Sequence, residues 1–469
     1  MRPLAGAPAS GKSVSILPLI VAALLIPAVL GSLKAILNDG DVSWHIATGQ
    51  WIIAHQAIPR ADPFSFTWAG KPWVPIEWLA ELIYAVAFRL AGYGGVAAVV
   101  TAALIGLHAI VYSNARRWLG TDLLPIVAMD FALVPMLSAR PHVLTWPLLA
   151  LWTSLMLKAR DTDRAPPLPA ALLMTVWANL HGSFVFGFLI AGVFGLEAAL
   201  KSRRRNEAFR AWLFFGLFCV AAVFINGNGV SGVLHPLRFT QLKMLPLIDE
   251  WKPSSPASTP FFFSVLLVIL ILAVWIRPRL PWTRWLLLFG LLVLAIVQVR
   301  HQAMFAIVAA MVLPQGFAQR ARPPAPSRGS LAYATAAAAV FIVALRALVP
   351  FVPPDNAANP WNLIASVPAS LRTEPVFNDY SMGGALILSG IRPFIDGRGD
   401  MYGDALVLGY ARIAGGDPKA LADAVSRWRI RWAILPNGSK LVPVLDRTPG
   451  WRELRRDKVG IIYIRSANA

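Results

Sequence analysis

The chain has 469 residues, of which 57% are hydrophobic and 14% are charged. Soluble domains carry roughly 25% charged residues, so this composition excludes a soluble enzyme, a disordered chain and a secreted disulfide scaffold. The formal net charge is +19, but the basic residues stand in short loops between apolar runs. This placement is typical of a membrane protein that faces anionic lipid headgroups, and it argues against nucleic acid as a partner.

Apolar runs that can cross a membrane, once their flanks are included, recur along most of the chain. We expect eleven spans, at residues 14–37, 94–113, 123–137, 143–157, 168–177, 184–200, 211–225, 261–276, 285–299, 303–317 and 331–351. The first run is longer than the core of a signal peptide, so we expect an uncleaved span. A further stretch, 76–91, carries Glu77, Glu81 and Arg89. We expect it to lie at the outer surface or dip into it.

Basic residues cluster in alternate loops between the runs, at residues 116–117, 158–164, 201–210, 277–284 and 320–328. The positive-inside rule assigns these loops to the cytoplasm. The amino terminus is then inside, and everything after residue 351 is outside. The sequence therefore predicts a transmembrane module, 1–351, with an outer first loop at 38–92, and an outer domain, 352–469.

The last part of the chain changes character. Short strand-like runs at 375–377, 393–395, 432–435 and 460–464 alternate with helical stretches at 382–388, 404–413 and 419–428. This alternation predicts a small α/β domain. The expected fold class is thus an α-helical polytopic membrane protein, with about eleven transmembrane helices and a small C-terminal α/β domain.

Charged groups and imidazoles gather in the predicted outer turns, directly beside apolar runs. The first of these turns holds Asp39 and Asp41, and residues 42–56 after it have the pattern of a helix lying flat at the membrane interface. The other candidate residues on this side are His45, Arg140, His142, Asn179, His181, Glu250, Arg300 and His301. Because ionisable groups beside hydrocarbon are costly, they mark a site when they face a cavity. Carboxylates supply a general base or metal ligands, and arginine and histidine hold a phosphate.

Purely structural interpretations stay open at this point. Asp39 and Asp41 also suit the end of a helix in a glycine turn. His142 and His181 also suit hydrogen bonding at the interface, and Arg300 suits an extended side chain that reaches lipid headgroups. Two nearby aspartates permit a divalent metal without requiring one, so no cofactor is assigned.

Several short motifs, taken in order, resemble the GT-C superfamily of polytopic glycosyltransferases that use polyprenyl-phosphate sugars. The membrane module carries D-x-x-W-H-x-A-x-G at 41–49, K-P-W at 71–73, W-x-N-x-H-G at 177–182, E-W at 250–251 and R-H at 300–301. The outer domain carries F-N-D-Y-x-x-G-G at 377–384 and F-I-D-G-R-x-D-x-Y-G at 394–403. The resemblance extends over nearly the whole chain, and the outer-domain motifs are similar to those of a large bacterial set within the superfamily.

The resemblance implies a polyprenyl-phosphate sugar as donor and an acid of the first outer loop as base or acceptor-positioning group. Asp41 aligns with that acid, and Asp39 is its neighbour. Many relatives have an acid pair here, whereas Val42 follows Asp41 in this chain. Others have a second acid in the next outer loop, where this chain has Arg140 and His142. The predicted function is an inverting sugar transfer to a periplasmic or lipid acceptor, with membrane lipids as further partners.

Two other functions remain as alternatives. A transporter or flippase of lipid-linked saccharides predicts polar residues at mid-span depth and an internal repeat. Here the polar residues gather on one side and the sequence shows no repeat. A non-catalytic scaffold for the assembly of envelope polysaccharide is the second alternative.

Overall fold

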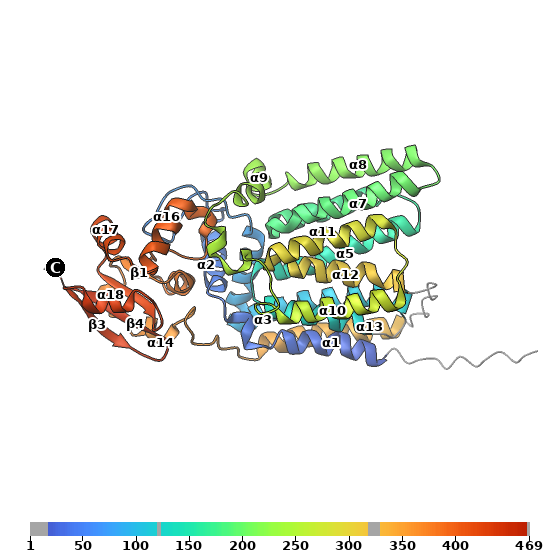
Figure 1. Cartoon of the computed structure of the whole chain (residues 1–469). Helices are drawn as coiled ribbons and strands as arrows, with labels where there is room; N and C mark the ends of the chain where they lie inside the picture. Colours follow the sequence, from blue (N-terminus) through green and yellow to red (C-terminus); the bar gives the residue numbers. More distant parts are fainter. Residues whose placement is uncertain (1–16, 120–122, 318–328, 467–469) are drawn as a thin grey trace, which may run out of the picture.

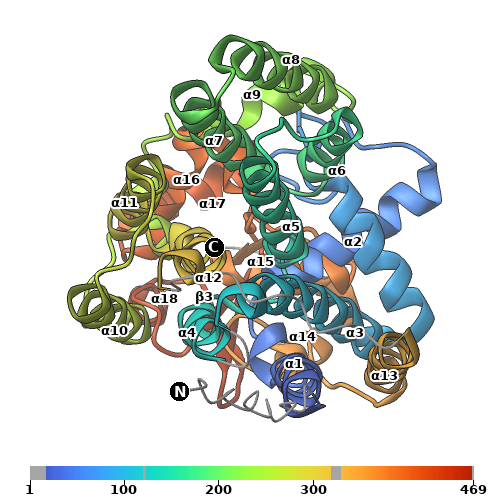
Figure 2. The same cartoon turned by 90° about the vertical axis from the view of Figure 1, so that its right-hand side faces the viewer.

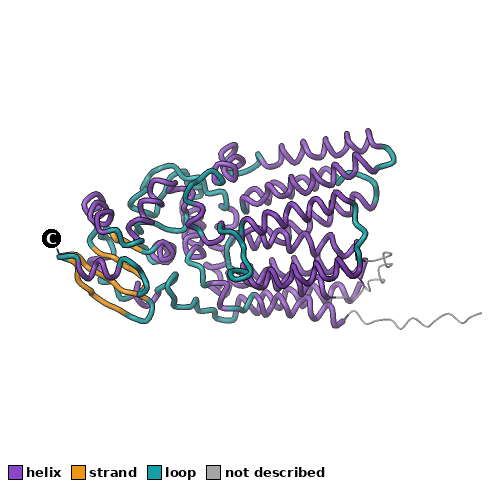
Figure 3. Tube along the Cα trace, in the orientation of Figure 1, coloured by secondary structure: helices purple, strands orange, loops and turns teal. Residues whose placement is uncertain are grey.

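The structure is a computed structural model, and it describes residues 17–119, 123–317 and 329–466. Figure 1 shows a bundle of helices that run side by side, with a smaller mixed domain at one end of the bundle. Figure 2 shows the bundle helices end-on. Strands occur only in the C-terminal domain of the described chain (Figure 3). The predicted mostly helical chain with a C-terminal α/β domain is confirmed.

Each of the eleven apolar runs overlaps one helix of the bundle. These helices are α1 (Leu17–Leu30), α3 (Trp78–Leu119), α4 (Leu124–Leu133), α5 (Pro141–Asp161), α6 (Leu172–Leu180), α7 (Val185–Lys201), α8 (Arg205–Val223), α10 (Pro260–Ile276), α11 (Trp282–Val297), α12 (Gln302–Phe317) and α13 (Gly329–Leu348). Among the described residues, three helical segments are long and apolar enough by themselves to cross a membrane: 78–119, 182–201 and 205–223. The number of spans therefore stays a prediction.

The long helix α3 is broken near its start. Ala91 and Gly92 have non-helical backbone angles, and Gly92 adopts a positive φ of 56°. Glycine tolerates this conformation because it has no Cβ. The break separates residues 78–90 from 93–119. Whether 76–91 lies at the outer surface stays a prediction.

Helix α2 (Asp41–His55) lies between the bundle and the C-terminal domain (Figure 1). The predicted helix is present, but its surroundings differ from the expectation of an interfacial helix. Its residues 42–49 are all buried, because α3 packs on one side and α15 (Gly383–Leu388) on the other. The helix is covered by protein. The apolar pattern of its own residues does not distinguish burial in protein from burial at a membrane surface.

The C-terminal domain contains a four-stranded sheet of order β1-β2-β4-β3. Strand β1 (Val376–Asn378) is parallel to β2 (Trp432–Pro436), and the pairs β2–β4 and β4–β3 are antiparallel, with β3 at Trp451–Arg456 and β4 at Gly460–Arg465. The helices of the domain are α14 (Trp361–Ala365), α15, α16 (Gly399–Ala414), α17 (Pro418–Trp428) and α18 (Val442–Arg447). A short helix, α9 (Gly229–Phe239), precedes the 3-10 turns that lead to α10.

The expected strand at 393–395 is wrong. Its backbone groups bond outside any sheet: the Asn378 side chain accepts from Phe394 N at 2.8 Å and donates to Ile395 O at 2.8 Å. The Thr67 hydroxyl donates to Phe394 O at 2.6 Å. Strand β3 was missed because it is polar and exposed over almost its whole length. Charged residues are typical of such edge strands, where they block further pairing.

The core of the C-terminal domain includes residues from the first loop. Trp44 of α2 and Trp73 pack with Phe377, Phe394 and the neighbouring buried side chains. The loop after the first helix and the C-terminal domain therefore share one apolar interior, although more than 300 residues separate them in the sequence.

Candidate functional site

Three acids from two outer turns converge on Arg140. Arg140 Nη1 lies 3.4 Å from Asp39 Oδ2, Arg140 Nη2 lies 3.2 Å from Asp41 Oδ2, and Arg140 Nη1 also contacts Glu250. Arg140 directly precedes α5, and Asp41 is the first residue of α2. The side chains of the three acids and Arg140 are 18–33% exposed. This group, the Arg140 cluster, is therefore reachable from solvent but largely enclosed.

Asp41 stands at the most enclosed point of the Arg140 cluster. Trp44 Nε1 donates to Asp41 Oδ1 at 3.0 Å. Burial raises the pKa of Asp41 to about 6, Arg140 opposes this shift and Asp39 adds to it. Burial disfavours the charged form of Arg140, but Asp41 and Asp39 outweigh it and raise the pKa of Arg140 above its usual value.

A second group of titratable residues lies around Glu77. Its carboxylate is 3.7 Å from His45 Nε2 and 3.3 Å from His181 Nε2. His45 Nδ1 lies 3.5 Å from Glu81. Burial raises the pKa of Glu77 to about 7, and burial lowers the pKa of His45 and of His181 well below the usual range. The imidazoles are therefore neutral at pH 7, and Glu77 is close to half protonated.

Sequence reasoning did not place Glu77 and Glu81 in the site. It used them only as charges that argue against a span at 76–91. A signal was present, because two acids four residues apart lie on the same face of a helix. An otherwise apolar helix with such a pair has one polar stripe, and here that stripe faces His45.

His142 lies next to His181, with 6.3 Å between the ring centroids. His142 Nε2 donates to Met136 O at 3.0 Å, so this bond fixes the orientation of the ring. The two imidazoles that the sequence placed in different outer turns are thus neighbours in the structure.

Arg300 and His301 form the 3-10 turn between α11 and α12. The Arg300 guanidinium lies over the Trp251 ring, 4.3 Å from its centroid. It makes no ion pair within the described residues. Burial and the charge of Arg140 lower the pKa of Arg300 to about 10. Burial and Arg300 lower the pKa of His301 to about 4. Arg300 is therefore a cation without a direct ion pair near the Arg140 cluster, beside a neutral imidazole, and the charge of Glu77 acts on it from a greater distance.

Asn179 lies at the same end of the bundle but has no free hydrogen-bonding capacity. Its Oδ1 accepts from Trp78 Nε1 at 2.7 Å and from Gly227 N at 3.1 Å. Its Nδ2 donates to Thr175 O at 2.8 Å and to Ile225 O at 2.9 Å. The amide ties α6 to α3 and to the segment after α8, so the geometry gives it a positioning role.

The F-I-D-G-R motif of the C-terminal domain is an internal anchor. Arg398 donates to Asp396 through Nε and Nη2 at 2.7 Å each and to Asp62 Oδ1 at 2.8 Å. Its guanidinium lies 4.7 Å from the Trp73 ring centroid. Arg398 and both acids are buried, so this network joins the first loop to the domain. The Gly397 backbone between them is held against Asp41.

Tyr380 of the F-N-D-Y motif was not singled out from the sequence as a site residue. Its hydroxyl makes no hydrogen bond in the described part of the chain. Burial, followed by the negative charges of Asp41, Asp396 and Asp400, raises its pKa well above the usual value. The hydroxyl therefore stays protonated and can donate a hydrogen bond.

The described residues contain no preformed metal site. No group of three or more His, Cys, Asp or Glu side chains there is arranged to hold a metal ion. In the Arg140 cluster, the acids are arranged around a guanidinium.

No protein-family model and no curated protein matches the chain. Among solved structures, the chain is similar to ArnT from Cupriavidus metallidurans, whose crystal structure is bound to undecaprenyl phosphate. The TM-score is 0.56 at 14% identity, covering 97% of this chain and 99% of ArnT. The chain has the fold of ArnT. Arabinosyltransferase EmbB from Mycobacterium smegmatis gives a TM-score of 0.40 at 14% identity over 97% of this chain and 45% of EmbB.

The fold brings these residues together through the connections between helices rather than through the middle of the helices. Asp41, Arg140, Glu250 and Arg300 all stand in turns or at helix starts. These turns lie at the bundle end that the C-terminal domain covers (Figure 1). Sequence positions as distant as 41 and 300 thus share one enclosed region.

Proposed function

We propose that the protein is a membrane glycosyltransferase that moves a sugar from a polyprenyl-phosphate donor to an acceptor hydroxyl. The observation that carries this proposal is the pairing of Asp41 with Arg140 beside the unpaired Arg300, under a covering domain. A carboxylate and a free guanidinium in one enclosed region supply a proton acceptor and an anion binder. The fold shared with ArnT supports the donor class, because that structure is bound to undecaprenyl phosphate.

The reaction we infer is an inverting displacement. Asp41 takes the proton of the acceptor hydroxyl, whose oxygen forms a bond to the anomeric carbon. The bond from that carbon to the phosphate oxygen breaks, and its electron pair leaves with the polyprenyl phosphate. With a pKa of about 6, Asp41 is mostly ionised at pH 7 yet basic enough to accept a proton efficiently. Asp39 holds the Asp41 main chain, since it accepts from Asp41 N at 2.9 Å.

Arg300 is assigned to the donor phosphate. Arg140 already pairs with three acids, whereas Arg300 has no anionic partner among the described residues. An arginine stabilises the charge that develops on the leaving phosphate. His301, neutral at pH 7, offers one further hydrogen bond, and Glu250 keeps Arg140 in place. His45, His142 and His181 shape the wall around Glu77.

The membrane position follows from the surface of the bundle. Large apolar side chains are exposed on its outer helices, for example Leu270 and Trp275 on α10 and Phe341 on α13. We assign this surface to lipid tails. The described basic loops lie at the bundle end opposite the C-terminal domain, such as the turn after α7 (Figure 1), and the basic loop at 320–328 lies outside the described residues. The positive-inside rule then supports eleven spans in a bacterial inner membrane, with the C-terminal domain in the periplasm.

The test is transfer from a labelled polyprenyl-phosphate sugar by purified protein in lipid nanodiscs, compared between the wild type and Asp41→Asn. We expect the rate to fall by at least a hundredfold in Asp41→Asn. The matched control is Asp249→Asn, because the Asp249 side chain is 92% exposed and lies one residue from Glu250.

Full activity of Asp41→Asn would remove Asp41 from the mechanism. Movement of intact donor between leaflets without release of polyprenyl phosphate would instead favour the flippase alternative. Neither release nor movement with any donor tested would favour the scaffold.

A further inference from the structure

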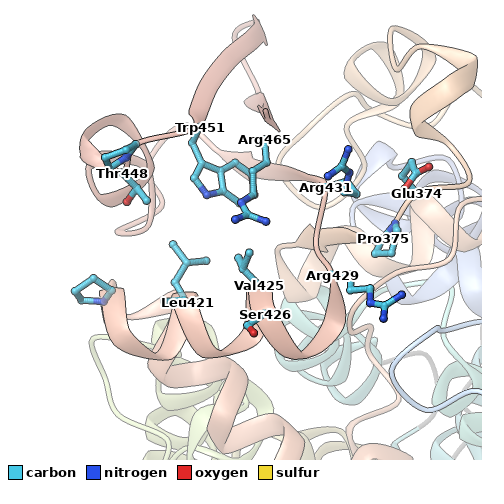
Figure 4. A pocket seen from close by; sticks show the side chains of 13 residues that line it. Glu374, Pro375, Leu421, Val425, Ser426, Arg429, Arg431, Thr448, Trp451 and Arg465 are labelled. Atoms are coloured by element: carbon cyan, nitrogen blue, oxygen red, sulfur yellow. The ribbon is translucent and has the colours of Figure 1, made fainter. Parts of the chain in front are cut away.

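A cavity of about 620 Å³ lies in the C-terminal domain and shares no lining residue with the Arg140 cluster. Figure 4 shows Trp451, Arg465 and Arg431 on one side of it, and Leu421, Val425 and Ser426 of α17 on the other. Its volume is within the range of about 300–1,000 Å³ that is usual for small-molecule sites. The cavity is therefore large enough for a ligand of several rings.

Three arginine side chains line this cavity: Arg429, Arg431 and Arg465. None of them makes an ion pair or a side-chain hydrogen bond within the described residues. The backbone brings two of them together, because Arg465 N donates to Arg431 O at 2.9 Å. Glu374 is an acid in the same lining, but it forms no ion pair with any of the three arginines. Three positive charges against one negative charge leave the lining net positive, and a bound anion reduces the repulsion between the arginines. The guanidinium fork matches the geometry of a carboxylate or a phosphate.

The rest of the lining is partly apolar. Trp451, at the start of β3, is half-buried and lines the cavity opposite Leu421 and Val425. An indole is a large, rigid, flat surface with one polar edge, and it packs well against the C–H face of a pyranose ring. Ser426 adds an exposed hydroxyl that donates and accepts hydrogen bonds.

We propose that this cavity binds an acidic saccharide, with a sugar ring on Trp451 and its carboxylate on the arginines. The inference does not rest on the transfer reaction. Helix α17 and strand β3 lie at the end of the molecule that is farthest from the bundle (Figure 1). Lipid headgroups of the membrane that holds the bundle do not reach this end. The ligand therefore comes from the aqueous side, and an uronate-containing glycan is the occupant we assign because it combines sugar rings with carboxylates.

The experiment is isothermal titration calorimetry of the full-length protein in phosphatidylcholine nanodiscs with trigalacturonate. Its fully methyl-esterified form is the comparison, because it keeps the same rings and loses only the charges. We expect trigalacturonate to bind at least tenfold more tightly than the ester. We also expect its affinity to fall as the salt concentration rises, because exposed charges are screened.

Two variants locate the binding. The double variant Arg431→Gln/Arg465→Gln and the single variant Trp451→Ala are each expected to weaken trigalacturonate binding at least tenfold. The matched control, Arg455→Gln, changes an exposed arginine of β3 that does not line the cavity, and it should bind as the wild type does. Circular dichroism checks folding, and the double variant decides the test if Trp451→Ala unfolds.

Several results would overturn the proposal. They are equal affinity for the ester, no binding at about 10 mM trigalacturonate, and unchanged binding in the double variant. Inorganic phosphate that binds as tightly as trigalacturonate, with no effect of Trp451→Ala on either, would reduce the cavity to an anion site. If the protein bound phosphatidylglycerol vesicles more tightly than trigalacturonate, the ligand of the cavity would be a lipid headgroup. Each result leaves the assignment of Asp41 untouched, because transfer activity is measured separately.

Discussion

Asp41 and Gly397 are in direct contact, although they come from opposite ends of the chain. A Cβ atom built on Gly397 would overlap Asp41 Oδ1 and approach Trp44 Nε1 to 2.9 Å. The backbone of the C-terminal domain thus lies directly against the carboxylate that we assign as the base.

We predict that Gly397→Ala lowers the transfer rate at least thirtyfold while the protein stays folded, because the methyl group must displace Asp41 from Arg140. Rates from single-turnover assays measure this effect. Gly409→Ala is the control, since a Cβ at this helical position in α16 meets nothing within 4 Å. Wild-type activity in Gly397→Ala would show that the position of Asp41 does not matter to the reaction.

Transfer should depend on pH through Asp41. Burial raises the pKa of this carboxyl to about 6, and only the ionised form accepts a proton. We therefore expect kcat/KM to rise tenfold per pH unit below about 6 and to level off above it. A profile of kcat/KM from pH 4.5 to 8 tests this expectation. A flat profile across this range would contradict the assignment of Asp41 as the base.

Donor binding should depend on Arg300. Because its guanidinium has no anionic partner in the described chain, Arg300→Gln should raise the donor KM roughly 10- to 100-fold, which is about 1.4–2.8 kcal/mol. Arg300→Lys should recover part of this loss, because lysine keeps the charge but not the fork. Arg279→Gln is the control, as this exposed arginine lies in the loop between α10 and α11. An unchanged donor KM in Arg300→Gln would show that Arg300 does not bind the donor phosphate.

The buried network of Arg398 should dominate the stability of the C-terminal domain. Arg398→Met leaves Asp396 and Asp62 buried without their cation, which costs about 3–5 kcal/mol. Arg456→Met breaks only an exposed pair with Glu453 and should change the stability far less. Thermal or urea unfolding of the two variants, followed by domain-specific fluorescence labels, measures the difference. Equal stability of the two would show that the network is not an anchor.

Several features of the site could be predicted from the sequence because they depend on local patterns. Asp41, Arg140 and Arg300 each follow or precede an apolar run, and a consistent alternation of loops brings such turns to one side. The helix at 41–55 is also a local property. Its burial is not, since it results from α15, more than 300 residues later.

Other features required tertiary contacts that no local pattern contains. Asn179 has the residue type of a ligand binder, and only the structure shows that all its hydrogen bonds go to α3, α6 and the segment after α8. The run 393–395 has the composition of a strand, but the side chain of Asn378 takes the place of a neighbouring strand. Glu77 and Glu81 can be assigned to the site only because they contact His45, which lies on another helix.

The shared interior of Trp44, Trp73 and the C-terminal domain has a consequence for synthesis. Ribosomes make the two tryptophans early, and the side chains that enclose them emerge only after more than 300 further residues. The first loop therefore cannot complete its packing until the C-terminal domain has been synthesised. A truncated chain that stops near residue 351 would leave both indoles exposed to water. Quality-control proteases recognise such exposed apolar side chains and would degrade the truncated chain.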